Sequence, residues 1–281
     1  MTIIDSTVKF HDGRQAPRLG FGTWQIPDDD AASVVETALR EGYRSIDTAA
    51  IYHNERGVGQ GIVRSGLPRE DVFLATKLWN DQHGHDVSRA AFEASLEKLG
   101  LDYVDLYLIH WPVPKWGKFV EAWEVLIQLH DEGLAKSIGV CNFNVNHLQT
   151  LLDETGVMPV LNQIELNPYF QQQTLREFHA EHDIVTESWS PLGRGALLED
   201  AVLVDIAHKH KRTTAQVVLR WHIQLGNMTI PKSVTPSRIK ENLQIFDFSL
   251  DDDDMRAIAD LDRGEEGRTG PDPVRFSLPK A

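Results

Sequence analysis

Residues 72–111, VFLATKLWNDQHGHDVSRAAFEASLEKLGLDYVDLYLIHW, contain the repeating unit that decides the fold. The apolar run Val72–Trp79 predicts a buried strand, and the periodic apolar residues of Val87–Leu99 predict a helix. Val104–Trp111 predicts a second buried strand. Two buried strands joined by a helix normally lie parallel, with the helix as the crossover between them. The unit therefore predicts an α/β architecture.

The same alternation continues in both directions along the chain. Six further strands are expected at Leu19–Trp24, Arg44–Ala49, Ser137–Asn142, Val160–Leu166, Ile184–Ser190 and Met228–Ser233. Further helices are expected at Ala31–Glu41, Arg56–Ser65, Lys118–Glu132, Val145–Thr155, Gln172–His182, Val202–Leu225 (with a break near Arg212–Thr213) and Pro236–Asn242. Eight such units, with no linker between two halves, favour a closed (β/α)8 TIM barrel over an open doubly wound sheet. We expect residues 1–281 to form a single domain with an irregular tail at about 263–281.

Composition and charge exclude several classes of function. The 281 residues carry a formal net charge of -14, which disfavours binding to nucleic acid or to anionic membranes. The start, MTIIDSTVKF, lacks the pattern of a signal peptide, and no apolar run is long enough to span a bilayer. The one cysteine, Cys141, has no companion for a disulfide or a zinc site. We therefore expect a cytoplasmic monomer that acts on a small molecule.

Four polar residues stand at the ends of three consecutive strands. Asp47 ends one strand and Tyr52 follows it, Lys77 lies on the next strand, and His110 lies on the third. In a barrel, these strand ends face a common mouth. A buried Asp47 and Lys77 would pair, and the lysine would lower the pKa of the Tyr52 phenol towards the working pH. Each residue alone is compatible with a structural role, but together they predict proton transfer coupled to hydride transfer, with His110 orienting a carbonyl oxygen.

The segment PKSVTPSRIKEN at residues 231–242 predicts a phosphate site. It leaves the eighth strand and begins a helix, so Lys232 and Arg238 lie near free backbone N–H groups and a positive helix end. The glycines of RGVGQG at residues 56–61 do not have the spacing of a dinucleotide-binding fingerprint. A Rossmann site is therefore not expected.

Several stretches in this order resemble the aldo-keto reductase superfamily over nearly the whole chain. They are GFGTW, IDTAAIYHNE, ATKLW, DLYLIHWP, SIGVCNF, NQIELNP, ESWSPLG and IPKSVTPSRIKEN. The chain looks most similar to the bacterial 2,5-diketo-gluconate reductase type. This resemblance implies NADPH-dependent reduction of aldehydes and ketones such as α-dicarbonyls or keto sugars. It also implies a catalytic tetrad of Asp47, Tyr52, Lys77 and His110, with Tyr52 as the general acid.

The resemblance also assigns the coenzyme contacts. Lys232, Ser233 and Arg238 would bind the 2′-phosphate of NADPH, and Asn242 would contact the adenine. Trp189 would stack on the nicotinamide, whose carboxamide Asn142 and Gln163 would hold, and Ser190, Leu192 and Gly193 would line the pyrophosphate. The remaining coenzyme residues implied are Thr23, Trp24, Asp47, Pro191 and Val234. Two positions depart from the family's common pattern, because Cys141 replaces a serine and Trp189 replaces a tyrosine.

Aromatic residues at the strand ends predict the substrate pocket. Trp24, Trp79 and Trp111 each close a strand and, with Tyr52 and His110, would form an apolar cup. The short connection WPVPKWGKF implies an open pocket.

Two further groups of residues receive non-catalytic interpretations. His83 and His85 are expected in a solvated turn and not at a metal site, and no metal is expected. Asp251–Asp254 are expected to cap a late helix and not to bind calcium. Two other functions stay open. They are a Schiff-base lyase with Lys77 as nucleophile, and a non-catalytic NADPH-binding module.

Overall fold

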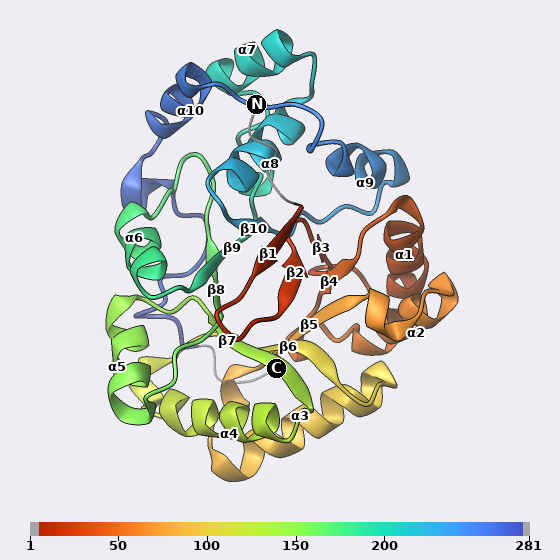
Figure 1. Ribbon diagram of the computed structural model, residues 1–281, viewed down its shortest axis with the longest axis vertical. Coiled ribbons are helices and arrows are strands. Elements are labelled where there is room, and N and C mark those ends of the chain that lie inside the picture. The colour runs from red at the N-terminus through yellow and green to blue at the C-terminus, as the bar shows by residue number, and fades with distance from the viewer. Residues whose placement is uncertain (1–5, 278–281) are drawn as a thin grey trace.

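The computed structural model describes residues 6–277, and in this part of the chain eight parallel strands form one sheet in chain order (Figure 1). The strands are β3 (Phe21–Gly22), β4 (Ser45–Asp47), β5 (Phe73–Leu78), β6 (Val104–Ile109), β7 (Ala135–Cys141), β8 (Leu161–Glu165), β9 (Val185–Trp189) and β10 (Met228–Thr229). The sheet closes on itself where Leu19 forms a parallel bridge to Thr229, and the N–H of Gly20 donates to the carbonyl of Thr229 at 2.9 Å. The predicted (β/α)8 barrel is confirmed.

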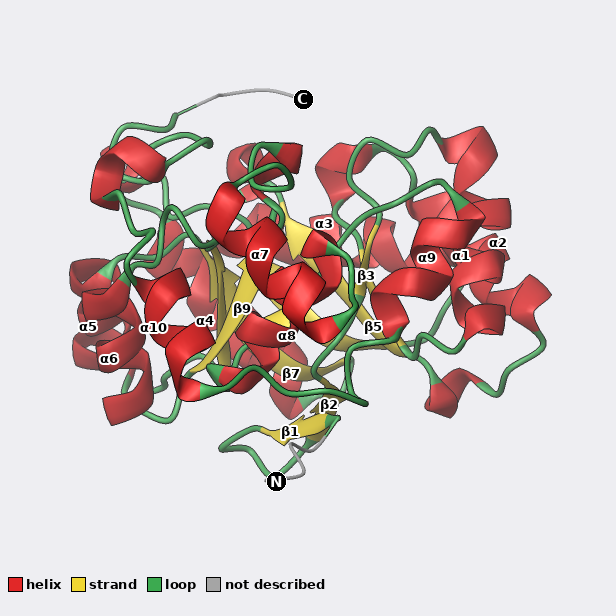
Figure 2. Ribbon diagram, turned by 90° about the horizontal axis from the view of Figure 1, so that it is seen from above, coloured by secondary structure: helices red, strands yellow, loops and turns green. Residues whose placement is uncertain are grey.

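Helices surround the barrel on all sides (Figures 1 and 2). They are α1 (Asp28–Glu41), α2 (Glu55–Ser65), α3 (His85–Leu99), α4 (Phe119–Asp131), α5 (Val145–Thr155), α6 (Gln173–Glu181), α7 (Ala201–His210), α8 (Thr214–Gln224), α9 (Pro236–Leu243) and α10 (Asp252–Ala259). The predicted break near Arg212–Thr213 is confirmed, because Thr213 caps α8. The predicted capping role of the acidic run is also confirmed, since Asp251 accepts from the N–H of Asp254 at the start of α10.

A hairpin that the sequence did not predict covers one end of the barrel (Figure 2). Strands β1 (Thr7–Lys9) and β2 (Gln15–Pro17) pair antiparallel through a turn in which Gly13 has a φ of 91°. Phe10 and Ala16 from this hairpin pack with buried residues of the barrel interior such as Leu106. The hairpin therefore plugs the N-terminal end of the strands and leaves their C-terminal ends for the site.

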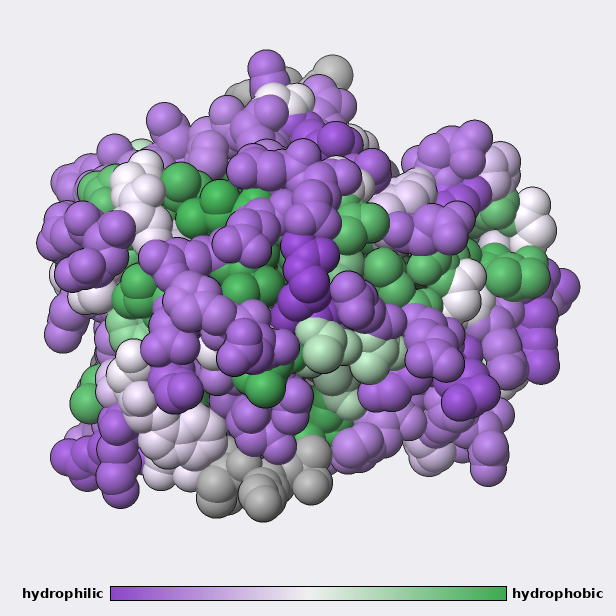
Figure 3. Space-filling model, turned by 90° about the horizontal axis from the view of Figure 1, so that it is seen from below, coloured by the Kyte–Doolittle hydropathy of each residue, from purple (hydrophilic) through white to green (hydrophobic). Residues whose placement is uncertain are grey.

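The core follows the alternation of side chains along each strand. On β6, Leu106 and Leu108 belong to the apolar cluster inside the barrel, whereas Tyr107 and Ile109 belong to the cluster between barrel and helices. The outer surface is mainly polar on the face seen in Figure 3, with smaller apolar areas between charged side chains. No helix within residues 6–277 combines the length and the apolar character needed to cross a bilayer.

The tail beyond Arg263 is mostly irregular, as predicted, apart from a short 3-10 turn at Gly264–Gly267. It passes over the end of the barrel that carries the C-terminal ends of the strands, where Pro271 and Phe276 line the main cavity. The last part of the predicted tail, residues 278–281, lies outside the described residues.

Candidate active site

A cavity of about 1040 Å³ lies at the C-terminal ends of the strands. Most of the predicted site residues line it, and these are Trp24, Asp47, Tyr52, Trp79, His110, Trp111, Asn142, Gln163, Trp189, Ser190, Pro191, Leu192, Lys232 and Arg238. The barrel thus brings together residues as far apart in the sequence as Trp24 and Arg238. The volume of the cavity is at the top of the range typical of ligand pockets, roughly 300–1,000 Å³.

The other predicted residues lie outside this lining. Thr23 is buried, and its hydroxyl donates to the backbone carbonyl of Asp47 at 3.0 Å, so it supports the end of β4. Gly193 begins the 3-10 turn Gly193–Gly195, between lining residues, and Ser233 and Val234 lie on the loop after Lys232, where Val234 is exposed. Asn242 is buried on α9.

A buried ion pair forms the floor of the cavity. The Lys77 Nζ lies 2.5 Å from Asp47 Oδ1 and donates a second hydrogen bond of 2.9 Å to the carbonyl of Thr48. The side chain of Lys77 is fully buried and that of Asp47 is 4% exposed. Because a buried charge without a partner costs several kcal/mol, each of these groups requires the other. The pairing predicted from the sequence is confirmed.

Tyr52 and His110 lie above this pair. Tyr52 ends a short 3-10 turn, Ala50–Tyr52, and the Lys77 Nζ lies 5.2 Å from the centre of its ring. The rings of Tyr52 and His110 are 5.7 Å apart and nearly perpendicular, and Trp79 packs edge-on against His110 at 5.1 Å. The Nδ1 of His110 is enclosed and has no hydrogen-bond partner among residues 6–277. A ligand in the cavity therefore meets the Nε2 side of the imidazole.

Burial dominates the protonation of the site. It raises the pKa of Tyr52 to about 12, although Lys77 lowers that pKa as predicted. The expectation that the phenol's pKa falls below its ordinary value is therefore wrong, because desolvation outweighs the cation. Burial and then Lys77 hold the pKa of His110 well below its usual range, so its imidazole is neutral. Burial lowers the pKa of Lys77, but Asp47 and Tyr52 raise it more, and the ammonium stays charged.

Asn142 links the backbone of His110 to the indole of Trp189. Its Nδ2 donates to the backbone carbonyl of His110 at 3.0 Å, and its Oδ1 accepts from Trp189 Nε1 at 2.8 Å. The residue has a φ of 62°, in the left-handed region where asparagine is tolerated better than most residues. The tryptophan that replaces the family's usual tyrosine thus uses its N–H to fix its own ring.

The basic end of the cavity lies at the start of α9. Lys232 and Arg238 are exposed, line the cavity, and bracket Thr235, the residue that precedes the helix. In the described part of the chain, Thr235 makes no side-chain capping bond, so the first N–H groups of α9 are open to an anion. Arg194, which the sequence reasoning missed, lies 5.4 Å from the ring of Trp24 across the cavity.

The tail, predicted only as irregular, adds residues to the wall of the cavity. Glu165 is buried at the end of β8 and accepts hydrogen bonds from the N–H and hydroxyl of Thr269 and from the N–H of Gly270. This anchoring brings Phe276 against Trp111, with ring centres 4.3 Å apart. The aromatic cup predicted from three tryptophans therefore gains a further wall from the tail.

One expectation about a turn is wrong. His83 was expected in a solvated turn, but it is only 5% exposed, and burial lowers its pKa to about 4. The 3-10 turn at Asn80–Gln82 folds this histidine inward. His85 is exposed, with Nε2 3.3 Å from Glu124. Within residues 6–277, no three His, Cys, Asp or Glu side chains are grouped to hold a metal.

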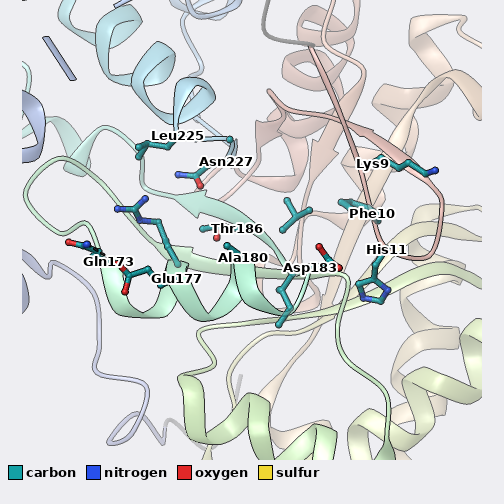
Figure 4. Close-up of a pocket in the computed structure, with 14 residues that line it drawn as sticks. Lys9, Phe10, His11, Gln173, Glu177, Ala180, Asp183, Thr186, Leu225 and Asn227 are labelled. Carbon is teal, nitrogen blue, oxygen red and sulfur yellow. Dashed lines mark hydrogen bonds between the residues drawn. The ribbon is translucent and has the colours of Figure 1, made fainter. Parts of the chain in front are cut away.

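A second cavity, of about 840 Å³, lies at the other end of the barrel, beside the N-terminal hairpin and α6 (Figure 4). Its lining mixes Lys9 and Arg176 with Glu177 and Asp183. None of the predicted site residues lies there. The predicted site residues that line a cavity therefore all lie at the C-terminal end of the barrel.

Comparison with known proteins identifies the class. Residues 18–263 match the model of the Aldo/keto reductase family, and the chain belongs to this family. It is thus an oxidoreductase of the NADP-dependent kind, as the resemblance implied.

Individual relatives are similar over nearly their full length. An aldo-keto reductase of Mycolicibacterium smegmatis is 53% identical over 271 residues, 96% of this chain and 98% of that protein. The methylglyoxal reductase DkgA of Escherichia coli K12 is 52% identical over 273 residues, with the same coverage. The crystal structure of Gox0644 in its apo form superposes with a TM-score of 0.94 at 51% identity, covering 97% of this chain and 98% of that one. A mutant of Gox0644 was solved in complex with NADPH, and it superposes with a TM-score of 0.93.

Proposed function

We propose that this enzyme reduces small aldehydes and ketones to alcohols with NADPH and that Tyr52 is the general acid. The observation that carries the proposal is the convergence of Tyr52 and His110 over the buried Lys77–Asp47 pair, in a cavity walled by aromatic rings. A phenol, a neutral imidazole and a fixed cation around one open space suit proton donation to a carbonyl oxygen.

Tyr52 has the protonation state that a general acid needs. With a pKa of about 12 it keeps its proton at neutral pH. An alkoxide formed from a carbonyl is a far stronger base than a phenolate, so proton transfer from the phenol is still downhill. His110 would donate its Nε2 proton to the same oxygen as a neutral hydrogen-bond donor.

The charged state of Lys77 weighs against a lyase. A Schiff-base nucleophile must be a neutral amine, whereas Asp47 and Tyr52 keep this ammonium protonated. Lys77 also lies outside the lining of the cavity, beneath Asp47 and Tyr52. Its role is to hold positive charge next to the phenol, which stabilises the phenolate after proton transfer.

The cavity has the features that NADPH requires. Lys232, Arg238 and the open N-terminus of α9 would hold the 2′-phosphate, and the indole of Trp189 would stack on the nicotinamide. Gln163 lines the cavity, and among the described residues its side-chain oxygen accepts no hydrogen bond, so it is free for the carboxamide. When bound, NADPH supplies the hydride. Arg238 and Lys232 would select NADPH over NADH.

The walls of the cavity support small carbonyl substrates. Trp79, Trp111 and Phe276 form a compact apolar cluster next to His110. The relative DkgA is named a methylglyoxal reductase, so α-dicarbonyls are the first class to test, followed by keto sugars. We further propose that residues 1–281 act as a single-domain monomer, because one barrel carries the buried ion pair, the aromatic walls and the basic end of the cavity. We also propose that the enzyme works in the cytoplasm.

The experiment is a screen of NADPH oxidation over a small panel of aldehydes, α-dicarbonyls and keto sugars, with wild type, Tyr52→Phe and Tyr103→Phe. Tyr103 is a matched control, because it is partly exposed, with the Arg69 guanidinium over its ring, and lies outside the cavity. Removing a general acid typically lowers the rate by about 10² to 10⁴. We expect this loss for Tyr52→Phe and wild-type turnover for Tyr103→Phe.

Two outcomes would contradict the proposal. Near-wild-type turnover by Tyr52→Phe would remove the phenol from the mechanism. Tight NADPH binding without turnover of any carbonyl would favour the non-catalytic binding module.

A further inference from the structure

Glu187 is a buried carboxyl that the reaction proposed above does not use. It lies on β9, is 3% exposed, and does not line the cavity. Its neighbours on β9 face outward, since Thr186 contacts His179 of α6 and Ser188 contacts His222 of α8. By the alternation of side chains along a strand, Glu187 faces the barrel interior. It forms no ion pair with a described Lys, Arg or His side chain.

A glutamine joins this carboxyl to the catalytic floor. Gln163 Nε2 donates to Glu187 Oε2 at 2.8 Å and to Asp47 Oδ2 at 2.9 Å. An amide nitrogen carries two hydrogens, so both are used. The amide oxygen is left for the cavity, which Gln163 lines. Rotating the amide by half a turn would place its oxygen between two carboxyl groups and leave both without their donor.

We propose that Glu187 is a positioning residue for the nicotinamide end of the coenzyme. It fixes the amide of Gln163 so that the nitrogen faces Asp47 and the oxygen faces the cavity. There the oxygen can accept a hydrogen bond from the carboxamide N–H of the coenzyme. This inference rests on the proposed function, in which Gln163 holds that carboxamide.

The protonation of Glu187 is compatible with this role. Burial, and then the charge of Asp47, raise the pKa of Glu187 to about 8. A neutral acid still presents an acceptor oxygen to Gln163 and avoids a second negative charge beside Asp47. The other ionisable groups that interact with this site are Lys77 on β5 and Cys141 on β7, whereas β10 pairs Met228 with Glu187. Lys77 and Asp47 form a pair of their own, so Glu187 is the group that changes charge near neutral pH.

The test compares two ligands that share the phosphate end but not the nicotinamide end. Dissociation constants for NADPH and for adenosine 2′,5′-bisphosphate are measured by quenching of tryptophan fluorescence and by calorimetry. The variants are Glu187→Leu, which removes the acceptor, and Glu187→Gln, which keeps an acceptor oxygen. Ser188→Ala is the matched control, because it removes a buried hydrogen bond from the same strand on its outward face. Thermal unfolding confirms that each variant is folded.

We expect Glu187→Leu to weaken NADPH about tenfold, the size of a lost or misdirected hydrogen bond, and to leave adenosine 2′,5′-bisphosphate within about twofold of wild type. Glu187→Gln should restore most of the NADPH affinity, and Ser188→Ala should change neither ligand. Equal losses for both ligands, no loss for either, or equal behaviour of the leucine and glutamine variants would overturn the proposal. If Glu187→Leu does not fold, Glu187→Gln decides by its pH profile.

That profile follows the charge on Glu187. In wild type, the affinity for NADP⁺ relative to NADPH should rise above about pH 8, because the ionised carboxylate favours the cationic nicotinamide. In Glu187→Gln the ratio should stay flat, and a rise equal to that of wild type would overturn the proposal. A wild-type protein that binds neither NADPH nor the bisphosphate would instead contradict the proposed function itself.

Discussion

Replacing Lys77 with methionine should destabilise the fold as well as abolish activity. The side chain of Lys77 is fully buried, and its ammonium lies 2.5 Å from Asp47 Oδ1. In the variant, Asp47 keeps only the hydrogen bond from Gln163 among its side-chain contacts and is left as a buried, unpaired charge. Removing one partner of such a pair costs about 3–5 kcal/mol of unfolding free energy. Methionine fills most of the volume of the lysine stem, so little of this loss comes from a cavity.

A double-mutant cycle separates the charge from the packing. Asp47→Asn combined with Lys77→Met leaves no buried charge at this position, so the double variant should be more stable than Lys77→Met alone. The coupling between the two sites should be about 2 kcal/mol, well above the 0.3–0.5 kcal/mol scatter of independent sites. Urea titrations followed by tryptophan fluorescence measure each unfolding free energy. All three variants should be inactive.

The control is an ion pair at the surface. Arg40 pairs with Glu36 on α1 and is 68% exposed. Arg40→Met should change the unfolding free energy by less than about 1 kcal/mol, because exposed pairs of this kind contribute little. Two results would refute the view that Asp47 and Lys77 form a coupled buried pair. One is a loss of unfolding free energy in Lys77→Met as small as that in Arg40→Met. The other is that the effects of Asp47→Asn and Lys77→Met on the unfolding free energy simply add.

Three further predictions concern the coenzyme, the pH dependence and the tail. Arg238→Ala should raise the NADPH dissociation constant by one to two orders of magnitude, because a charge-assisted hydrogen bond contributes about 1.5–3 kcal/mol. It should barely change the dissociation constant of NADH. Equal losses of affinity for the two coenzymes in a fluorescence titration would place Arg238 away from the 2′-phosphate. Because the pKa of Glu187 is raised, the native state keeps a proton that the unfolded state has lost. As the pH rises from about 5 to 8, the unfolding free energy of wild type should therefore fall by roughly 1 kcal/mol per pH unit relative to that of Glu187→Gln. Urea midpoints of the two proteins that stay parallel across this range would contradict the prediction. Glu165→Leu should release the tail, so that amide hydrogen exchange at Thr269 and Gly270 becomes faster and the KM for carbonyls rises several-fold. Unchanged exchange at these two residues would show that Glu165 does not anchor the tail.

The sequence predicted the barrel because the buried strands of a parallel sheet are apolar on both faces. Each of the eight expected strands overlaps one that formed, and α5 has the predicted bounds, Val145–Thr155. The expected strand Met228–Ser233 is shorter, Met228–Thr229, since a proline at position 231 has no N–H for the ladder. The hairpin β1–β2 was missed because strands of three residues carry too little alternation to be recognised. The Asp-Gly pair in its turn was the available signal.

The site was predictable where the position of a residue along a strand determines which face of the sheet its side chain points to. Side chains alternate between the two faces of a strand, and Asp47, Lys77 and Gln163 occupy positions that face the barrel interior, where hydrogen bonds connect them through Asp47. Glu187 satisfies the same rule and was missed, although its place one residue before Ser188 on β9 marks it as inward-facing. Phe276 could not be placed in this way, because its position depends on the contact of Glu165 with the tail, more than one hundred residues away. Irregular segments have no periodicity from which such contacts can be read.

The geometry and the pKa shifts together favour Tyr52 over His110 as the proton donor. Tyr52 and His110 both line the cavity, but burial and Lys77 keep the imidazole of His110 neutral. It therefore lacks the second ring proton that an imidazolium would donate. Protonating it would place a second cation beside the buried ammonium, which the low dielectric of the site opposes. The phenol of Tyr52 has the reverse relation to that ammonium, because losing its proton creates an anion next to a fixed positive charge. Burial and the same lysine thus keep His110 in its neutral form, with no extra proton to transfer, whereas the lysine stabilises the phenolate that Tyr52 leaves behind, and it does so without entering the cavity.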